Sequence, residues 1–134
     1  MLTYEIATGY LITADGTKLE PPGYSGNGEF KNVPDAQDIK DHGPIPEGFY
    51  TLSALIEDDP KTGPYSILLA PDEMNSMFSR SGFRIHGDSL SDPGNASDGC
   101  IVQARPIRVR VWTSQDHRLR VIDRLPVLEP PELT

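Results

Sequence analysis

The residues of this sequence best suited to chemistry are its single cysteine, Cys100, and His86, which precedes it across a short polar loop. A thiol with its reference pKa of about 8.5 is only a few per cent thiolate at neutral pH. An imidazole beside the thiol takes up its proton and lowers the thiol pKa. The pair therefore predicts an ionised cysteine nucleophile, Cys100, with His86 as its base.

The residues around the pair are suited to bringing the two side chains together. Residues 83–86 are expected to form a short apolar strand that ends at His86 and fixes its ring. Nearly all residues of the following loop form turns and can return Cys100 to that ring. Gly99 permits a close approach of the backbone to a substrate. We expect the amides of Gly99 and Cys100 to donate to a developing oxyanion.

Several neighbouring polar residues have two interpretations each. Ser97 either tunes the thiolate or ends the loop. Arg84 shares a strand face with the histidine, and it either binds a substrate carboxylate or pairs with surface acids. Asp88 either orients the histidine or forms a turn, and a backbone carbonyl is the alternative partner for the imidazole. Tyr24 and Ser25 either line a cleft or pack in the core. Arg80 and Arg105 are weaker candidates for carboxylate binding.

The remaining pattern predicts a mainly β fold that positions these residues. Twelve glycines and 13 prolines argue against long helices. Short helices are expected over residues 71–80 and 106–113, with a strand as the alternative for the second. Residues 20–47 are expected to form a long ordered loop. Strands are expected over residues 2–13, 17–19, 48–56, 65–69, 83–86 and 119–122. We expect one domain over residues 1–134, with a loose tail over about residues 125–134.

Composition and charge exclude several classes of function. The formal net charge of −8 repels the phosphates of nucleic acids and anionic lipids. One cysteine excludes an internal disulfide and a multi-cysteine zinc site. The acidic run 57–59 lacks the spacing of a calcium loop and is expected to be a solvated turn, so neither a metal nor a cofactor is predicted.

Two absences bear on localisation. No segment approaches the roughly 18 apolar residues of a membrane span. The N-terminal residues lack the basic segment of a secretory signal, because the first basic residue is Lys18. We therefore expect synthesis in the cytoplasm, followed either by retention there or by export along a route that reads no cleavable signal.

Several short motifs together resemble a known family. His86, followed after a loop by Ser97-Asp98-Gly99-Cys100, resembles the signature of the L,D-transpeptidase catalytic domain. The general signature has a second histidine where this chain has Asp98, which is expected to face solvent because a nearby carboxylate would raise the thiol pKa. The whole set, over roughly residues 24–102, is closer to type VI secretion L,D-transpeptidase effectors. The set comprises Tyr24-Ser25-Gly26, Gly43-Pro44-Ile45-Pro46-Glu47-Gly48 with Tyr50, Ser81-Gly82-Phe83, Ile85-His86-Gly87, and Ser97 with Gly99-Cys100-Ile101.

The resemblance implies a fold, a reaction and partners. The fold is an L,D-transpeptidase-like β-sandwich or set of curved sheets with one or two short helices. Cys100 would attack the carbonyl joining the third residue of a tetrapeptide stem of peptidoglycan to its terminal D-alanine. Water, a stem amine or a D-amino acid would resolve the acyl-enzyme. An immunity protein and a secretion apparatus are the other implied partners, and the target-cell periplasm is the implied site of action.

The candidate site residues form two groups. The catalytic group is Cys100, His86, Ser97, Gly99 as part of the oxyanion hole, and Gly87. The substrate-binding group is Arg84, Tyr24, Ser25, Asp88 and Asp98.

Two other functions compete with this one. The first is a papain-like cysteine peptidase or amidase, although in that group the cysteine precedes the histidine along the chain. The second is a non-catalytic wall-binding or phage or secretion-apparatus module of the same fold, which would explain the missing second histidine.

Overall fold

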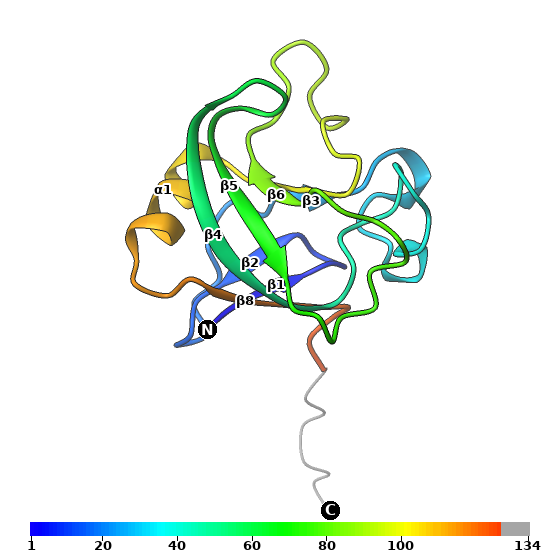
Figure 1. Ribbon diagram of the computed structural model, residues 1–134, viewed down its shortest axis with the longest axis horizontal. Helices are drawn as coiled ribbons and strands as arrows, with labels where there is room; N and C mark the ends of the chain where they lie inside the picture. The colour runs from blue at the N-terminus through cyan, green and yellow to red at the C-terminus, as the bar shows by residue number, and fades with distance from the viewer. Residues whose placement is uncertain (127–134) are drawn as a thin grey trace, which may run out of the picture.

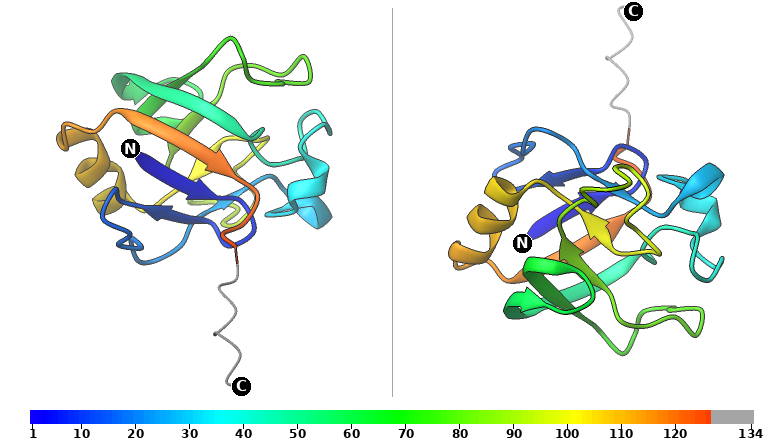
Figure 2. Two further views of the ribbon diagram at one scale, coloured as in Figure 1. Left: turned by 90° about the horizontal axis from the view of Figure 1, so that it is seen from below. Right: turned by 90° about the horizontal axis from the view of Figure 1, so that it is seen from above.

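Eight strands form one strongly curved, nearly closed sheet in the computed structural model, which describes residues 1–126. The strand order across the sheet is β2-β1-β8-β4-β5-β6-β7-β3. Figure 2 shows β1, β8 and β4 side by side, with helix α1 at one end of the molecule and the 3₁₀ turns at the other. The elements are β1 Leu2–Glu5, β2 Tyr10–Ile12, β3 Tyr24–Ser25, η1 Gly28–Phe30, η2 Pro34–Ala36, β4 Gly48–Asp59, β5 Gly63–Pro71, β6 Arg84–His86, β7 Ile101–Val102, α1 Arg105–Thr113 and β8 Arg118–Ile122.

The mainly β prediction is confirmed, and so is the preference for a helix near residues 106–113. Pro106 occupies the first turn of α1, where its missing N–H costs no hydrogen bond. The helix predicted over residues 71–80 is wrong. Phe78 and Ser79 have φ angles of 55° and 58°, which a right-handed helix does not allow. Asn75 instead binds both backbone groups of Phe49 on β4 and holds this segment as a loop.

The N-terminal expectations are confirmed only in part. The single strand predicted over residues 2–13 is two antiparallel strands, separated by a turn in which Gly9 has a φ of 79°. The predicted return strand after the turn at residues 15–16 is reduced to one bridge between Ile12 and Lys18. The loop predicted over residues 20–47 contains β3 and two 3₁₀ turns. The predicted C-terminal tail lies outside the described residues except for its first two positions.

The hydrophobic core fills the inside of the curved sheet. It includes Tyr4 from β1, Tyr50 from β4 and Leu119 from β8, each fully buried. Helix α1 closes one side by burying Ile107 and Val111. Each such side chain contributes about 1.5–3 kcal/mol on burial, so this core fixes the strands that carry polar residues on their other face.

Two pairings position the candidate site. Strands β4 and β5 form a long antiparallel hairpin that curves across the front of the molecule in Figure 1, and its turn lies beyond Asp59. Strands β6 and β7 run parallel, with Ile85 opposite Ile101 and His86 opposite Val102. Strand β6 also pairs with β5, so the hairpin turn, His86 and the start of β7 come together at one edge. No helix among residues 1–126 is both long and apolar enough to cross a membrane.

Candidate active site

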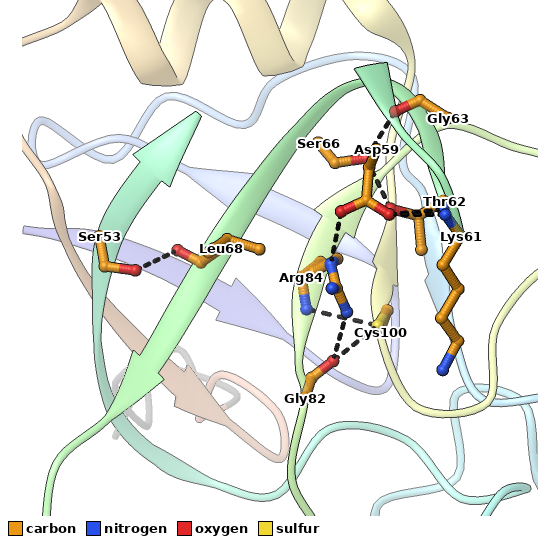
Figure 3. A network of polar contacts seen from close by, with 10 residues as sticks. All are labelled: Ser53, Asp59, Lys61, Thr62, Gly63, Ser66, Leu68, Gly82, Arg84 and Cys100. Atoms are coloured by element: carbon orange, nitrogen blue, oxygen red, sulfur yellow. Dashed lines mark hydrogen bonds and ion pairs between the residues drawn. The ribbon is translucent and has the colours of Figure 1, made fainter. Parts of the chain in front are cut away.

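Cys100 directly precedes β7, and it lines a cleft of about 190 Å³. The sulfur accepts a hydrogen bond from the backbone N–H of Arg84 at 3.3 Å, and the thiol faces the carbonyl oxygen of Gly82 at 3.8 Å (Figure 3). The thiol is therefore held against β6 and is reachable from the cleft. The other lining residues are Lys40, Asp41, Lys61, Thr62, residues 79–84, Ala96 and Asp98.

His86 ends strand β6 and is almost fully buried. Its Nδ1 lies 2.7 Å from the carbonyl oxygen of Gly87. A carbonyl oxygen only accepts hydrogen bonds, so the ring proton is on Nδ1 and Nε2 carries the basic lone pair. The imidazole is thus oriented by a backbone carbonyl. Asp88 makes no bond to the ring.

The sulfur and the imidazole lie on one face of the sheet but are not bonded to each other. Ile85 and Ile101 both point into the core, so the alternating residues Arg84, His86 and Cys100 share the other face. The parallel register places Cys100 opposite Arg84, with His86 two residues further along. Strands about 4.8 Å apart with a rise of about 3.3 Å per residue separate the two Cα atoms by about 8 Å.

The direct contact expected between Cys100 and His86 is therefore absent among the described residues, because Arg84 is the cross-strand neighbour of the cysteine. The pKa shifts of the two groups also disfavour the expected ion pair. Burial raises the pKa of the Cys100 thiol, and the Arg84 N–H bond and the charges of Arg84 and Lys61 oppose this rise only in part. Burial likewise lowers the pKa of His86. Both shifts favour the neutral form of the group concerned.

Ser97 shapes the turn before the cysteine and does not touch the sulfur. Its fully buried hydroxyl donates to the Cys100 carbonyl at 2.6 Å and accepts from the amides of Gly26 at 2.9 Å and Gly99 at 3.1 Å. The Gly99 amide is therefore engaged by Ser97 in this structure and is not a free donor for the predicted oxyanion hole. The Cys100 amide donates to no residue in the range 1–126 and is the remaining donor.

Ser25 is also a structural residue. Its hydroxyl donates to the Gly99 carbonyl at 3.0 Å, accepts from the Ile45 amide at 2.8 Å, and is fully buried. Its full burial favours the alternative that Ser25 packs in the core over the predicted place in a substrate cleft. Gly99 itself has a φ of 136°, and a Cβ there would lie 2.3 Å from Nη2 of Arg80. Only glycine fits this position without displacing the arginine.

Arg80 clamps the loops around the cleft. Its guanidinium donates to four carbonyl oxygens, those of Gln37, Gly43, Pro44 and Asp98. The side chain is buried and its hydrogen-bonding capacity is largely used, so the structure contradicts its role as a carboxylate ligand. These bonds give the Gly43-Pro44 segment a structural role, because its two carbonyl oxygens accept hydrogen bonds from Arg80.

Tyr24 and Asp88 secure the loop between β6 and β7. The Tyr24 hydroxyl donates to Asp88 at 2.6 Å and accepts from the Ala96 amide at 3.0 Å. Asp88 also accepts from the amides of Ser89 and Gly94, as a turn-forming aspartate does. Neither residue lines the cleft at Cys100; both line a separate pocket with Val102.

Asp59 is the residue that sequence reasoning missed. Its buried carboxylate forms an ion pair with Nε of Arg84 at 3.1 Å. It also accepts hydrogen bonds from the backbone amides of Lys61 and Thr62 (Figure 3). The amide bonds from Thr62 and Lys61 lower its pKa, as does the charge of Arg84. The predicted solvated turn is wrong for this residue. One interpretation of Arg84 is a pair with surface acids; its partner is an acid, but a buried one, Asp59.

The other two polar positions behave more simply. Asp98 is exposed at the cleft, as expected, and its charge raises the pKa of Cys100. Arg105 lies over the ring of Tyr65, away from the sulfur. No cluster of three or more metal-ligating side chains occurs within residues 1–126.

A mainly β domain with a cysteine in an open cleft and a buried histidine on the same sheet face is an architecture suited to acyl transfer. The family model of the Tlde1 domain matches residues 20–126, and the chain belongs to this family of type VI secretion L,D-transpeptidase effectors. The family comprises secreted enzymes that act on peptidoglycan. No curated protein and no solved structure gives a significant match.

Proposed function

We propose that this chain is a peptidoglycan-modifying cysteine enzyme, an L,D-carboxypeptidase or L,D-transpeptidase that acts on tetrapeptide stems in the periplasm of a target cell. The observation that carries the proposal is the placement of the Cys100 thiol in an open cleft, on the same sheet face as a histidine with a fixed tautomer. Membership in the Tlde1 domain family supports the substrate class. We also propose that residues 1–134 form one catalytic domain.

The first step transfers a proton from the Cys100 thiol to the imidazole of His86 during the attack on the substrate. Rotation about the Cα–Cβ bond of Cys100 turns the thiol from Gly82 toward Nε2 of His86. The sulfur attacks the carbonyl between the third stem residue and D-alanine while Nε2 takes the thiol proton. A sulfur–carbon bond forms, and the carbonyl oxygen becomes an oxyanion that accepts a hydrogen bond from the Cys100 amide.

The second half of the step releases the leaving group. The tetrahedral intermediate collapses, the carbon–nitrogen bond breaks, and the imidazolium of His86 returns its proton to the departing amine of D-alanine. The Gly87 carbonyl stabilises the imidazolium and keeps its ring in place. Water, a stem amine or a D-amino acid then attacks the thioester, which gives trimming, crosslinking or exchange. Asp98, at the rim of the cleft, is a candidate contact for the incoming acceptor.

Incubation with purified disaccharide tetrapeptide, followed by liquid chromatography and mass spectrometry, tests this function. The wild-type chain should release or exchange D-alanine, and Cys100→Ala should do neither. His86→Gln should lower the rate by about 10²–10⁴-fold, the usual contribution of a general base. A wild-type profile identical to that of Cys100→Ala would contradict catalysis and favour the non-catalytic module. Cleavage between sugar and peptide would indicate an amidase.

The effector family also indicates partners beyond the substrate. We propose that the secretion apparatus delivers the chain and that an immunity protein protects the producing cell.

A further inference from the structure

The cleft at Cys100 is cationic although the chain as a whole is acidic. The chain carries a formal charge of −8. In contrast, the lining of the cleft has four cationic side chains, Lys40, Lys61, Arg80 and Arg84, against two acidic ones, Asp41 and Asp98. A cleft with this local charge attracts anions from a surface that otherwise repels them.

Lys61 is the cation best placed to bind a ligand. Arg80 is occupied by four carbonyl oxygens, and Arg84 is paired with Asp59. The ammonium group of Lys61 makes no hydrogen bond or ion pair within residues 1–126, and its charge lowers the pKa of the Cys100 thiol. Lys61 therefore lies within electrostatic reach of the sulfur with its charge unneutralised.

The position of Lys61 is built into the hairpin. Its backbone amide donates to one oxygen of Asp59 at 2.8 Å, while the other oxygen binds Nε of Arg84 at 3.1 Å. One buried carboxylate thus fixes the two cationic residues on either side of the thiol, and Figure 3 shows both side chains beside Cys100. The lysine backbone belongs to a short turn between two long, paired strands, which fixes where the side chain begins.

We propose that Lys61 binds the free carboxylate of the substrate's C-terminal residue, and that this contact restricts the cleft to peptides cleaved at their last bond. The identity of the peptide rests on the proposed function. In such a peptide only a nitrogen and a Cα separate the attacked carbonyl carbon from the terminal carboxylate carbon. Standard bond lengths place these carbons within about 4 Å of each other. A cation near the sulfur therefore contacts the carboxylate while the sulfur contacts the scissile carbonyl.

Alkylation of the full chain tests the carboxylate site without using enzymatic activity. Iodoacetate and iodoacetamide both react when the Cys100 sulfur displaces iodide. They differ mainly in charge, because iodoacetate is an anion and iodoacetamide is neutral. The alkylation ratio, the iodoacetate rate divided by the iodoacetamide rate, does not depend on the fraction of the thiol that is ionised. We expect this ratio to exceed that of N-acetylcysteine by about fivefold, the effect of one partly solvated charge pair.

Substitutions identify the responsible charge. Lys61→Met should return the alkylation ratio to that of N-acetylcysteine, and Lys61→Glu should lower it further. Lys18→Met is the matched control, because Lys18 lies over the ring of Tyr10 and does not line the cleft. An unchanged ratio in Lys61→Met would overturn the proposal.

A second comparison separates this proposal from the proposed function. The wild-type chain should prefer the tetrapeptide stem over its C-terminal amide, mainly through KM, and Lys61→Met should remove this preference. Release of D-alanine without any preference would refute the role of Lys61 and leave the function intact. If neither stem is cleaved while the alkylation ratio depends on Lys61, the function fails and the carboxylate site remains.

Discussion

Ser97→Ala tests whether this hydroxyl builds the cysteine turn or acts on the sulfur. The buried hydroxyl makes three hydrogen bonds, to the Cys100 carbonyl and to the amides of Gly26 and Gly99. Removing it leaves these backbone groups without a partner. Each unsatisfied buried group costs about 1–3 kcal/mol, and partial relaxation offsets some of this. We therefore expect the free energy of unfolding to fall by about 3 kcal/mol.

Urea unfolding measures this change. With an m-value of about 2 kcal/mol/M, a loss of about 3 kcal/mol lowers the midpoint by about 1.5 M. Ser53→Ala is the matched control, because that exposed hydroxyl makes a single bond of 3.3 Å to Leu68 and should change the stability by less than about 0.5 kcal/mol. If Ser97→Ala unfolds like the wild-type chain but alters the alkylation rate of Cys100, the hydroxyl acts on the sulfur and our reasoning is refuted.

Three further predictions concern the surroundings of the thiol. Gly99→Ala should lower the melting temperature by about 10 °C, because its Cβ would meet Arg80 and its φ is positive; an unchanged melting curve would contradict this. Tyr24→Phe should speed hydrogen exchange of the Ala96 amide about tenfold, and equal protection would show that the hydroxyl does not hold the loop. Iodoacetamide should label Cys100 more slowly than free cysteine at pH 7, because burial raises the thiol pKa. The labelling rate should reach half of its maximum at a higher pH than for free cysteine, and a midpoint at a lower pH would argue against this environment.

Local patterns predicted those parts of the fold that depend on neighbouring residues. The alternation over residues 48–56 indicated β4, and Pro106 favoured a helix that begins within one residue of the start of α1. The segment 71–80 has a plausible helical pattern, but its conformation depends on the bonds between Asn75 and Phe49, which are distant in sequence. A tertiary contact of this kind leaves no local signal.

The site shows the same division. Cys100 and His86 could be selected as candidates because their residue types and the loop between them are visible in the sequence. The roles of Asp59 and Arg80 could not be predicted, because they depend on strand pairings and loop contacts between distant segments. The raised pKa of the thiol was also hidden, because it follows from burial, which depends on how distant segments pack around the cysteine.

The most direct test of the central claim is to trap the acyl-enzyme. The chain is mixed with disaccharide tetrapeptide, quenched in acid within a fraction of the turnover time, and digested for mass spectrometry. We predict a thioester adduct on the peptide that contains Cys100, with the mass of the stem lacking its terminal D-alanine, and no adduct in Cys100→Ala. Release of D-alanine by Cys100→Ala at the wild-type rate would contradict the claim that this sulfur is the nucleophile.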